Sequence, residues 1–239
     1  MKNVLFKIRR QEKPAACAYW ELFDLQYAEG MTVALALEQI QRRPINADGR
    51  AVTPVVWDRG DFCLIRINGK PRVPQEVDVR EVFQPICLEP LSKFPVMRDL
   101  IVDRSREEKD GQRLQAWSRL DAYHNTNEHR SAVVADDLCR DLARCTSCGA
   151  CLEACPQYHP SSAFVGPRLL LRCQQHLSNT RSTDHQRAML EALASDGGVF
   201  DCCNAQNCQR VCPQKINITE NIGLLKRAVL KGAVKRFLG

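Results

Sequence analysis

The sequence lacks any long apolar run, although 44% of its 239 residues are hydrophobic. No stretch approaches the roughly 18 apolar residues that a membrane-spanning helix needs. The N-terminal segment, MKNVLFKIRRQEK, also lacks the apolar core and the small-residue cleavage site of a secretory signal peptide. We therefore expect a chain that stays in the cytoplasm or in an equivalent reducing compartment.

Aromatic residues are scarce, at 6%, and they do not interleave with the basic residues of the C-terminal tail, although the net charge is +6. Nucleic-acid-binding surfaces usually combine the two, so we expect no nucleic-acid partner. A glycine-rich nucleotide-binding fingerprint is also missing. The basic tail suits either an acidic partner or a solvated helix face, and the sequence leaves both open.

Cysteine, in contrast, is abundant, with 13 residues. Disulfides are rare in a reducing compartment, so ligation of a metal or a cluster is the expected use. Two short runs, at 145–155 and 202–212, hold eight of the 13, and seven of these eight have the spacing of ligands. Apart from Cys203, the others are expected to be small buried hydrophobic residues: Cys17, Cys63, Cys87, Cys139 and Cys173.

The first run has the spacing C-x2-C-x2-C-x3-C-P, which is typical of paired iron–sulfur clusters. Its first three cysteines surround one cluster, and the fourth turns toward the other. The second run, C-x5-C-x3-C-P, returns its last cysteine to the first cluster by the same crossing. We therefore predict a [4Fe-4S] cluster on Cys145, Cys148, Cys151 and Cys212, and a [3Fe-4S] cluster on Cys155, Cys202 and Cys208.

Three thiolates are enough for a [3Fe-4S] cluster, because its missing iron corner needs no ligand. Ala205 stands nearest the place of a fourth ligand and cannot bind iron. Cys203 is adjacent to a predicted ligand, but we expect it to face the other side of the chain. Zinc is the inorganic rival, since two pairs of thiolates hold it tetrahedrally. The number and spacing of the cysteines favour clusters.

The first half of the chain predicts a sheet crossed by a helix, of β-grasp type. Alternating patterns and turn signals predict strands at 4–9, 20–27, 55–57 and 62–67, the last closed by an Asn-Gly turn at 68–69. An unbroken apolar pattern predicts a helix over 31–41, which ends before Pro44.

The second half predicts helices. A charged segment at 105–115 is the expected linker, and helices are predicted at 132–143, 167–177, 185–194 and 218–237. The fold class is therefore α+β, with a β-grasp ferredoxin-like domain over 1–106 and an all-α two-cluster ferredoxin domain over 107–239.

Together with Phe164-Val165-Gly166-Pro167, the two cysteine runs resemble the iron–sulfur subunit of succinate dehydrogenase/fumarate reductase. The segments PVVWD at 54–58, INGKPR at 67–72 and FPVMRDL at 94–100 are similar to the ferredoxin domain of that subunit. The resemblance covers nearly the whole chain. Its character is closer to the bacterial type with a diheme membrane anchor.

This resemblance implies an electron relay between a flavoprotein subunit that carries FAD and a quinone at a membrane anchor, which can hold haem b. The chemistry on succinate or fumarate then belongs to the flavoprotein. The chain is expected on the cytoplasmic face of the bacterial inner membrane, held there by the anchor. The resemblance also places the quinone near the second cluster, beside Pro156, His159 and Cys203.

The family's [2Fe-2S] site is where this sequence departs from the pattern. The loop between Trp57 and Ile67 is several residues shorter than in the family, and Val73-Pro74-Gln75 stands where the last ligand belongs. Only Cys63 aligns with a ligand, so three of the four are expected to be missing. Two alternatives follow: a structural or assembly paralogue without productive electron transfer, and a two-cluster adaptor between soluble partners.

Overall fold

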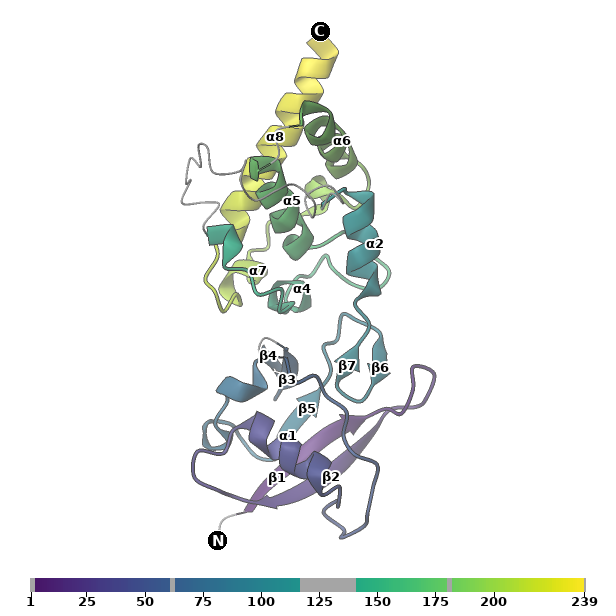
Figure 1. Ribbon diagram of the computed structural model, residues 1–239, viewed down its shortest axis with the longest axis vertical. Helices are drawn as coiled ribbons and strands as arrows, with labels where there is room; N and C mark the ends of the chain where they lie inside the picture. Colours follow the sequence, from purple (N-terminus) through teal and green to yellow (C-terminus); the bar gives the residue numbers. More distant parts are fainter. Residues whose placement is uncertain (1–2, 61–62, 117–140, 180–181, 239) are drawn as a thin grey trace, which may run out of the picture. The chain divides into compact units, whose positions relative to one another are not determined.

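The computed structural model describes residues 3–60, 63–116, 141–179 and 182–238 (Figure 1). The chain divides into two compact units, Met1–Arg104 and Ser105–Gly239. The predicted boundary between residues 106 and 107 lies two residues further along the chain. No helix of the described ranges is both long and apolar enough to cross a membrane.

The N-terminal unit is built on a five-stranded sheet in the order β2-β1-β5-β3-β4. β1 runs antiparallel to β2 and parallel to β5, so the sheet is mixed. The helix α1 lies across the strands in Figure 1. This arrangement confirms the predicted β-grasp fold, and its elements are β1 (Asn3–Arg10), β2 (Tyr19–Gln26), α1 (Val33–Arg42), β3 (Ile65–Ile67), β4 (Lys70–Arg72) and β5 (Ile86–Glu89).

The core of this unit lies between α1 and one face of the sheet. Alternate residues of β1 point toward the helix, and Phe6 and Ile8 are fully buried there. From α1, Leu37 and Ile40 meet them in the same cluster of buried residues. Thr32 caps the helix by accepting a hydrogen bond from Leu35 N, at 3.3 Å. The predicted helix is thus confirmed, because its apolar spacing matches the face that the sheet covers.

The hairpin between β3 and β4 turns at Asn68-Gly69, as predicted. Both residues have positive φ, 48° and 78°, which the two-residue turns of twisted hairpins require. The predicted strand at 55–57 is wrong, because the structure has no strand there. Asp99 holds the segment instead, by accepting from Val56 N at 2.9 Å and from the buried Arg10 Nε at 3.0 Å. A side chain therefore satisfies the Val56 amide, while the Val56 carbonyl accepts from Leu100 N at 3.2 Å.

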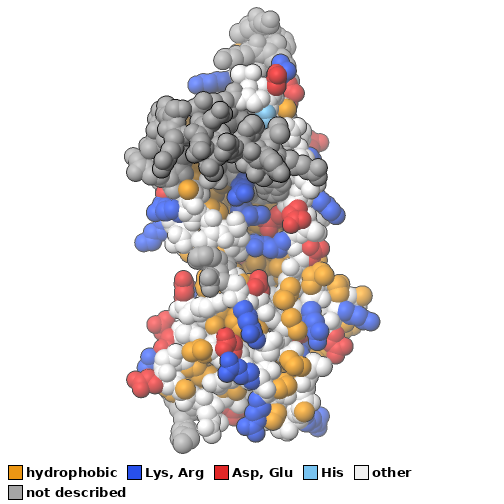
Figure 2. All heavy atoms as spheres, in the orientation of Figure 1, with side chains coloured by type: hydrophobic (Ala, Val, Ile, Leu, Met, Phe, Trp, Pro, Cys, Tyr) orange, Lys and Arg blue, Asp and Glu red, His pale blue; other side chains and the backbone are white. Residues whose placement is uncertain are grey.

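The remaining strands of the unit form a separate small hairpin, β6 (Val96–Arg98) with β7 (Ile101–Val102), and two single turns of 3-10 helix cover 74–76 and 79–81. Figure 2 shows apolar side chains on the surface of this unit, interspersed with charged ones. On β2 the exposed apolar residues are Tyr19, Trp20 and Leu22. Trp20 and Leu22 alternate with the buried Glu21 and Phe23, so they lie on the face that α1 does not cover, and Tyr19 begins the strand.

The described part of the second unit is helical, as predicted. Its long C-terminal helix, α8, packs against α5 and α6 (Figure 1). Ser182 caps α6 by accepting from His185 N at 3.3 Å. The helices are α2 (Ser105–Arg113), α4 (Ala150–Glu153), α5 (Pro167–Asn179), α6 (Thr183–Ala194), α7 (Asn207–Arg210) and α8 (Ile218–Leu238), with a 3-10 turn at 199–201.

The linker predicted at 105–115 is wrong, because residues 105–113 form α2. Its charges pair within the helix, where Asp110 lies 3.4 Å from Arg106 and 3.8 Å from Arg113. Glu107 is only 3% exposed and forms an ion pair with Arg168 of α5. The charged composition thus partly reflects ion pairing, while Glu108 and Lys109 remain exposed. Most of the helix predicted at 132–143 lies outside the described residues, and only 141–143 are seen to be helical.

Candidate iron–sulfur centres

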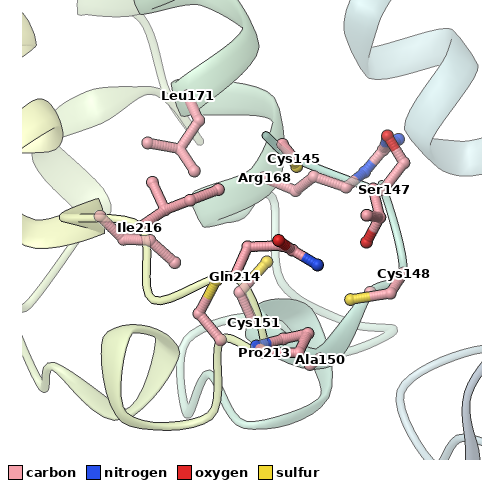
Figure 3. Close-up of a pocket in the computed structure, with 14 residues that line it drawn as sticks. Cys145, Ser147, Cys148, Ala150, Cys151, Arg168, Leu171, Pro213, Gln214 and Ile216 are labelled. Carbon is pink, nitrogen blue, oxygen red and sulfur yellow. The ribbon is translucent and has the colours of Figure 1, made fainter. Parts of the chain in front are cut away.

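A pocket in the helical unit brings together four cysteines from both runs. Its walls enclose about 340 Å³ of space free of protein atoms, part of it open to solvent. In Figure 3, Cys145, Cys148 and Cys151 surround the pocket, and Pro213 and Gln214 reach it from the facing loop. The predicted set for the first cluster, Cys145, Cys148, Cys151 and Cys212, therefore lines a single pocket.

The backbone explains how residues so close in sequence reach one pocket. Ser147 and Gly149 have positive φ, 57° and 93°, so the chain turns sharply between successive cysteines. The short helix α4 starts immediately afterwards and buries Cys151. In the second run Asn204 and Gln206 are also left-handed, at 58° and 62°, just before α7. Both runs therefore wrap around a volume instead of extending past it.

The second pocket collects cysteines from the same two runs and encloses about 350 Å³. Cys155, Cys202 and Cys208 line it, as the prediction requires, together with Pro156 and Ala205. Its apolar walls come from Phe164, Pro167 and Ile222. Sulfur donors from both cysteine runs thus meet at a second, separate place.

Two other residues named from the sequence have the following positions relative to this second pocket. Cys203 lines it as well and is exposed, and its expected absence from the ligand set stays a prediction. His159 is not among the described residues that line it. Its ring nitrogen Nδ1 lies 3.4 Å from Ser161 Oγ, and its carbonyl accepts a hydrogen bond from Arg106 Nη1 at 2.8 Å.

The thiols of both pockets are unfavourable places for uncompensated negative charge. Burial raises the pKa of Cys151 well above its ordinary value, and the neighbouring Cys148 and Cys145 add to the effect. Burial also raises the pKa of Cys208 to about 11, with a further contribution from Cys155. Iron ions would supply the positive charge that lets such thiols ligate as thiolates. An all-sulfur donor set fits the soft-ligand chemistry of iron–sulfur clusters.

The thiols are not arranged around a single point. Among the described residues, no three His, Cys, Asp or Glu side chains converge closely enough to hold one metal ion. A cluster contains several iron atoms and is larger than one ion, and each cysteine binds a different iron. Its ligands therefore surround a volume, as the two pockets do.

Cationic side chains flank both pockets. Arg168 lines the first pocket and donates from Nε to the buried Glu107. Lys226 of α8 donates from Nζ to the backbone carbonyl of Cys202, at 2.8 Å, beside the second pocket. The sequence indicated a basic tail, but it did not indicate that Lys226 turns inward. Positive charge near sulfur ligands favours the reduced state of a cluster.

The other cysteines have varied environments. Cys173 is fully buried in α5, as expected, whereas Cys17 is exposed, contrary to expectation. Cys63 and Cys87 are half-buried, and Cys139 lies outside the described residues. Burial raises the pKa of Cys63 to about 12, and Asp58 contributes further.

The N-terminal unit contains three cysteines and no histidine. Cys87 lies on β5, where it pairs with Lys7 of β1. Cys17 lies in the loop beyond the last residue pair of the β1–β2 hairpin, Arg10 with Tyr19. Cys63 precedes β3 and donates its backbone N–H to Gly60 O, at 3.0 Å. The three therefore belong to three different segments of the unit.

Two family models match the chain. One, described as a 2Fe-2S iron-sulfur cluster binding domain, matches residues 5–109, and another, described as a 4Fe-4S dicluster domain, matches residues 141–216. Both units are therefore iron–sulfur domains by family. The first match does not by itself support the predicted loss of [2Fe-2S] ligands, which stays a prediction.

Curated relatives and solved structures agree with these matches. The fumarate reductase iron-sulfur subunit of Wolinella succinogenes is 24% identical over 220 residues, covering 89% of this chain and 90% of that protein. In the apo Sdh1 complex of Mycobacterium smegmatis, one chain has the same fold, with a TM-score of 0.73 and 20% identity over 96% of both chains. The succinate dehydrogenase iron-sulfur subunit of Bacillus subtilis (strain 168) is 35% identical over 245 residues, covering 100% of this chain and 97% of that protein. The chain belongs to the family of succinate dehydrogenase and fumarate reductase iron–sulfur subunits.

Proposed function

We propose that this chain is the electron-transfer subunit of a succinate dehydrogenase/fumarate reductase-type complex, acting between a flavoprotein and a membrane quinone. One observation carries the proposal: two separate pockets, each lined by cysteines from both runs. A structural zinc site needs only one group of four ligands. Two pockets that share their ligand runs are what a pair of redox centres in one relay requires.

The first pocket is proposed to hold a [4Fe-4S] cluster on Cys145, Cys148, Cys151 and Cys212. The second is proposed to hold a [3Fe-4S] cluster on Cys155, Cys202 and Cys208, because Ala205 offers no donor. Such clusters store and release single electrons inside a protein. The numbers of thiols and the apolar walls of each pocket support this assignment.

The protein's own contribution is to hold, bury and polarise these sites. Cys151 and Cys208 are only 9% and 8% exposed, so little water reaches these two ligands, whereas Cys145 is exposed. Hydrogen bonds from the backbone amides of Gln157 and Tyr158 favour the thiolate form of Cys155 and oppose the rise in its pKa that burial causes. Burial and hydrogen bonds to sulfur are among the main protein features that set the potential of a cluster.

The N-terminal unit is proposed to lack an ordinary [2Fe-2S] cluster, although its fold belongs to a [2Fe-2S] family. A cluster of that kind takes four cysteines, and the unit has three, in three different segments. Cys63 is then the remnant of the family site. Electrons must accordingly enter this subunit by another route.

This feature favours a second candidate function, that of a structural or assembly paralogue that carries no productive current. The two candidates differ in one measurement, which is succinate-dependent quinone reduction by the assembled complex. Activity that survives in the complex and is lost on replacing Cys151 would exclude the paralogue. A soluble two-cluster adaptor has less support, because the succinate dehydrogenase iron-sulfur subunit of Bacillus subtilis matches the whole chain, both units included.

The proposed partners are a flavoprotein that carries FAD and a membrane anchor that binds quinone and haem b. The proposed location is the cytoplasmic face of a bacterial inner membrane, where the anchor holds the subunit. Family membership supports both statements. Affinity purification of the tagged chain from detergent-solubilised membranes should recover a flavin-bearing subunit and a haem-bearing one.

Electron paramagnetic resonance of the anaerobically purified chain, with iron and sulfide counted on the same sample, tests the centres directly. We expect a [3Fe-4S] signal in the oxidised sample, a [4Fe-4S] signal after dithionite, and about seven iron atoms per chain from the sum of the two clusters. A further [2Fe-2S] signal would overturn the proposal for the N-terminal unit. Stoichiometric zinc without iron would overturn the redox function.

A further inference from the structure

The loop that connects the first cysteine run to α5 begins and ends at the second pocket. Pro156 and Gln157 line the pocket immediately after Cys155, and Phe164 lines it at the other end of the loop. Between them the loop buries Tyr158, which is 1% exposed. The conformation of residues 156–164 therefore fixes one wall of the pocket.

Arg106 of α2 binds this loop at three backbone carbonyls. Its Nη1 donates to His159 O at 2.8 Å, and its Nη2 donates to Phe164 O at 3.0 Å and to Ser162 O. The guanidinium carbon also lies 4.8 Å from the centre of the Tyr158 ring. A planar guanidinium presents five donors in a fixed geometry, so one side chain can set the spacing of several carbonyls at once.

Arg106 is itself held in place. Asp110, one helical turn further along α2, lies 3.4 Å from Arg106 Nε and is half-buried. The next residue of the helix, Glu107, pairs with Arg168, which lines the first pocket. Neighbouring residues of α2 therefore reach toward the two pockets separately.

We propose that Arg106 is a positioning residue for the second iron–sulfur centre, acting through the carbonyls of residues 159, 162 and 164. This inference rests on the proposed function, in which Cys155, Cys202 and Cys208 hold a cluster. Without the guanidinium the three carbonyls lose their shared donor, and the loop next to Cys155 relaxes. A positive charge also leaves the neighbourhood of the cluster, which disfavours its reduced state.

The experiment compares the full-length wild-type chain with Arg106→Gln, Arg106→Lys and Lys109→Gln, all purified anaerobically. Lys109→Gln is the matched control, because this substitution removes one positive charge from the exposed face of the same helix. Redox titrations followed by electron paramagnetic resonance give the midpoint potential of each centre. The decay of each electron paramagnetic resonance signal during exposure to air gives the rate at which each centre is lost, and iron counts give the total loss.

For Arg106→Gln we expect a lower midpoint potential and faster loss of the second centre, with an unchanged first centre. Arg106→Lys keeps the charge but cannot span three carbonyls. The midpoint potential and the rate of loss of its second centre should therefore lie between those of the wild type and Arg106→Gln. Lys109→Gln should match the wild type, since an exposed charge is screened by salt. If Arg106→Gln does not accumulate, Arg106→Lys alone tests the proposal: its second centre should change while its first centre stays as in the wild type.

Two results would overturn this role: a second centre unchanged in both Arg106 variants, or equal damage to both centres, which would mark a general contribution to folding. A wild-type chain with no second-centre signal is a different failure. In that case the proposed function falls, whatever the variants do.

Discussion

Lys226 Nζ donates a hydrogen bond of 2.8 Å to the backbone carbonyl of Cys202, joining α8 to the second cysteine run. The contact is half-buried and charged, and such bonds contribute about 1.5–3 kcal/mol. It fixes the backbone at the point where the chain enters the second pocket. It also places a positive charge next to a proposed ligand.

Replacing Lys226 with Gln should therefore lower the midpoint potential of the second centre and destabilise the helical unit by about 1–2 kcal/mol. Lys231, exposed on the same helix, is the control, and Lys231→Gln should change neither quantity. Redox titration and thermal unfolding of the two variants check this. Equal effects of both substitutions would show that only the net charge matters.

Each cysteine run supplies one ligand to the cluster that the other run mainly holds. A substitution at that ligand should therefore abolish the signal of the other run's cluster. Cys212→Ser, in the second run, should abolish the [4Fe-4S] signal, because Cys212 lines the first pocket. Cys155→Ser, in the first run, should abolish the [3Fe-4S] signal, because Cys155 lines the second. Electron paramagnetic resonance of each variant reads both signals. The exposed Cys17→Ser is the control, and a loss that follows the run instead of the pocket would contradict the assignment.

Replacement by alanine should have opposite effects on stability at Gly166 and at Gly223. Gly166 has φ of +86°, and an added Cβ would lie 2.4 Å from Leu152 Cδ2 and 2.9 Å from Tyr158 Cδ2, both buried side chains near the pockets. Gly166→Ala should thus cost about 2 kcal/mol or more. Gly223 lies within α8 with nothing within 4 Å of such a Cβ, so Gly223→Ala should stabilise by about 0.5–1 kcal/mol. Thermal unfolding, followed by circular dichroism, measures the two shifts.

The pH dependence of Cys63 follows from its pKa of about 12, which burial raises from 9.0. The folded chain favours the neutral thiol of Cys63. The stability of the folded chain is therefore unaffected by this group below about pH 9 and falls as pH rises from 9 toward 12. Alkylation by iodoacetamide at pH 8, followed by mass spectrometry, should modify the exposed Cys17 quickly and Cys63 slowly. The rate at Cys63 should rise about tenfold per pH unit up to pH 11. Equal rates at pH 8 would contradict the buried position.

Local patterns determined several features of the fold before any contact was known. The 3.6-residue spacing of apolar residues placed α1, and the Asn68-Gly69 pair placed the β3–β4 turn. The cysteine spacing indicated two centres, because ligands of one cluster must be close along the chain or cross between runs. These signals lie within a few residues of one another, which is the range over which sequence patterns act.

Only the tertiary structure decided the features that depend on residues far apart in the chain. α2 is a helix rather than a linker because Glu107 meets Arg168, 61 residues away. Residues 55–57 form no strand, and Asp99, 43 positions from Val56, accepts the hydrogen bond of the Val56 amide. Cys203 lines the second pocket although its neighbour is a proposed ligand, and Arg106 reaches three carbonyls beyond position 158. No local pattern encodes such pairings, since each partner is ordinary in its own segment and its energy arises only when folding brings the two together.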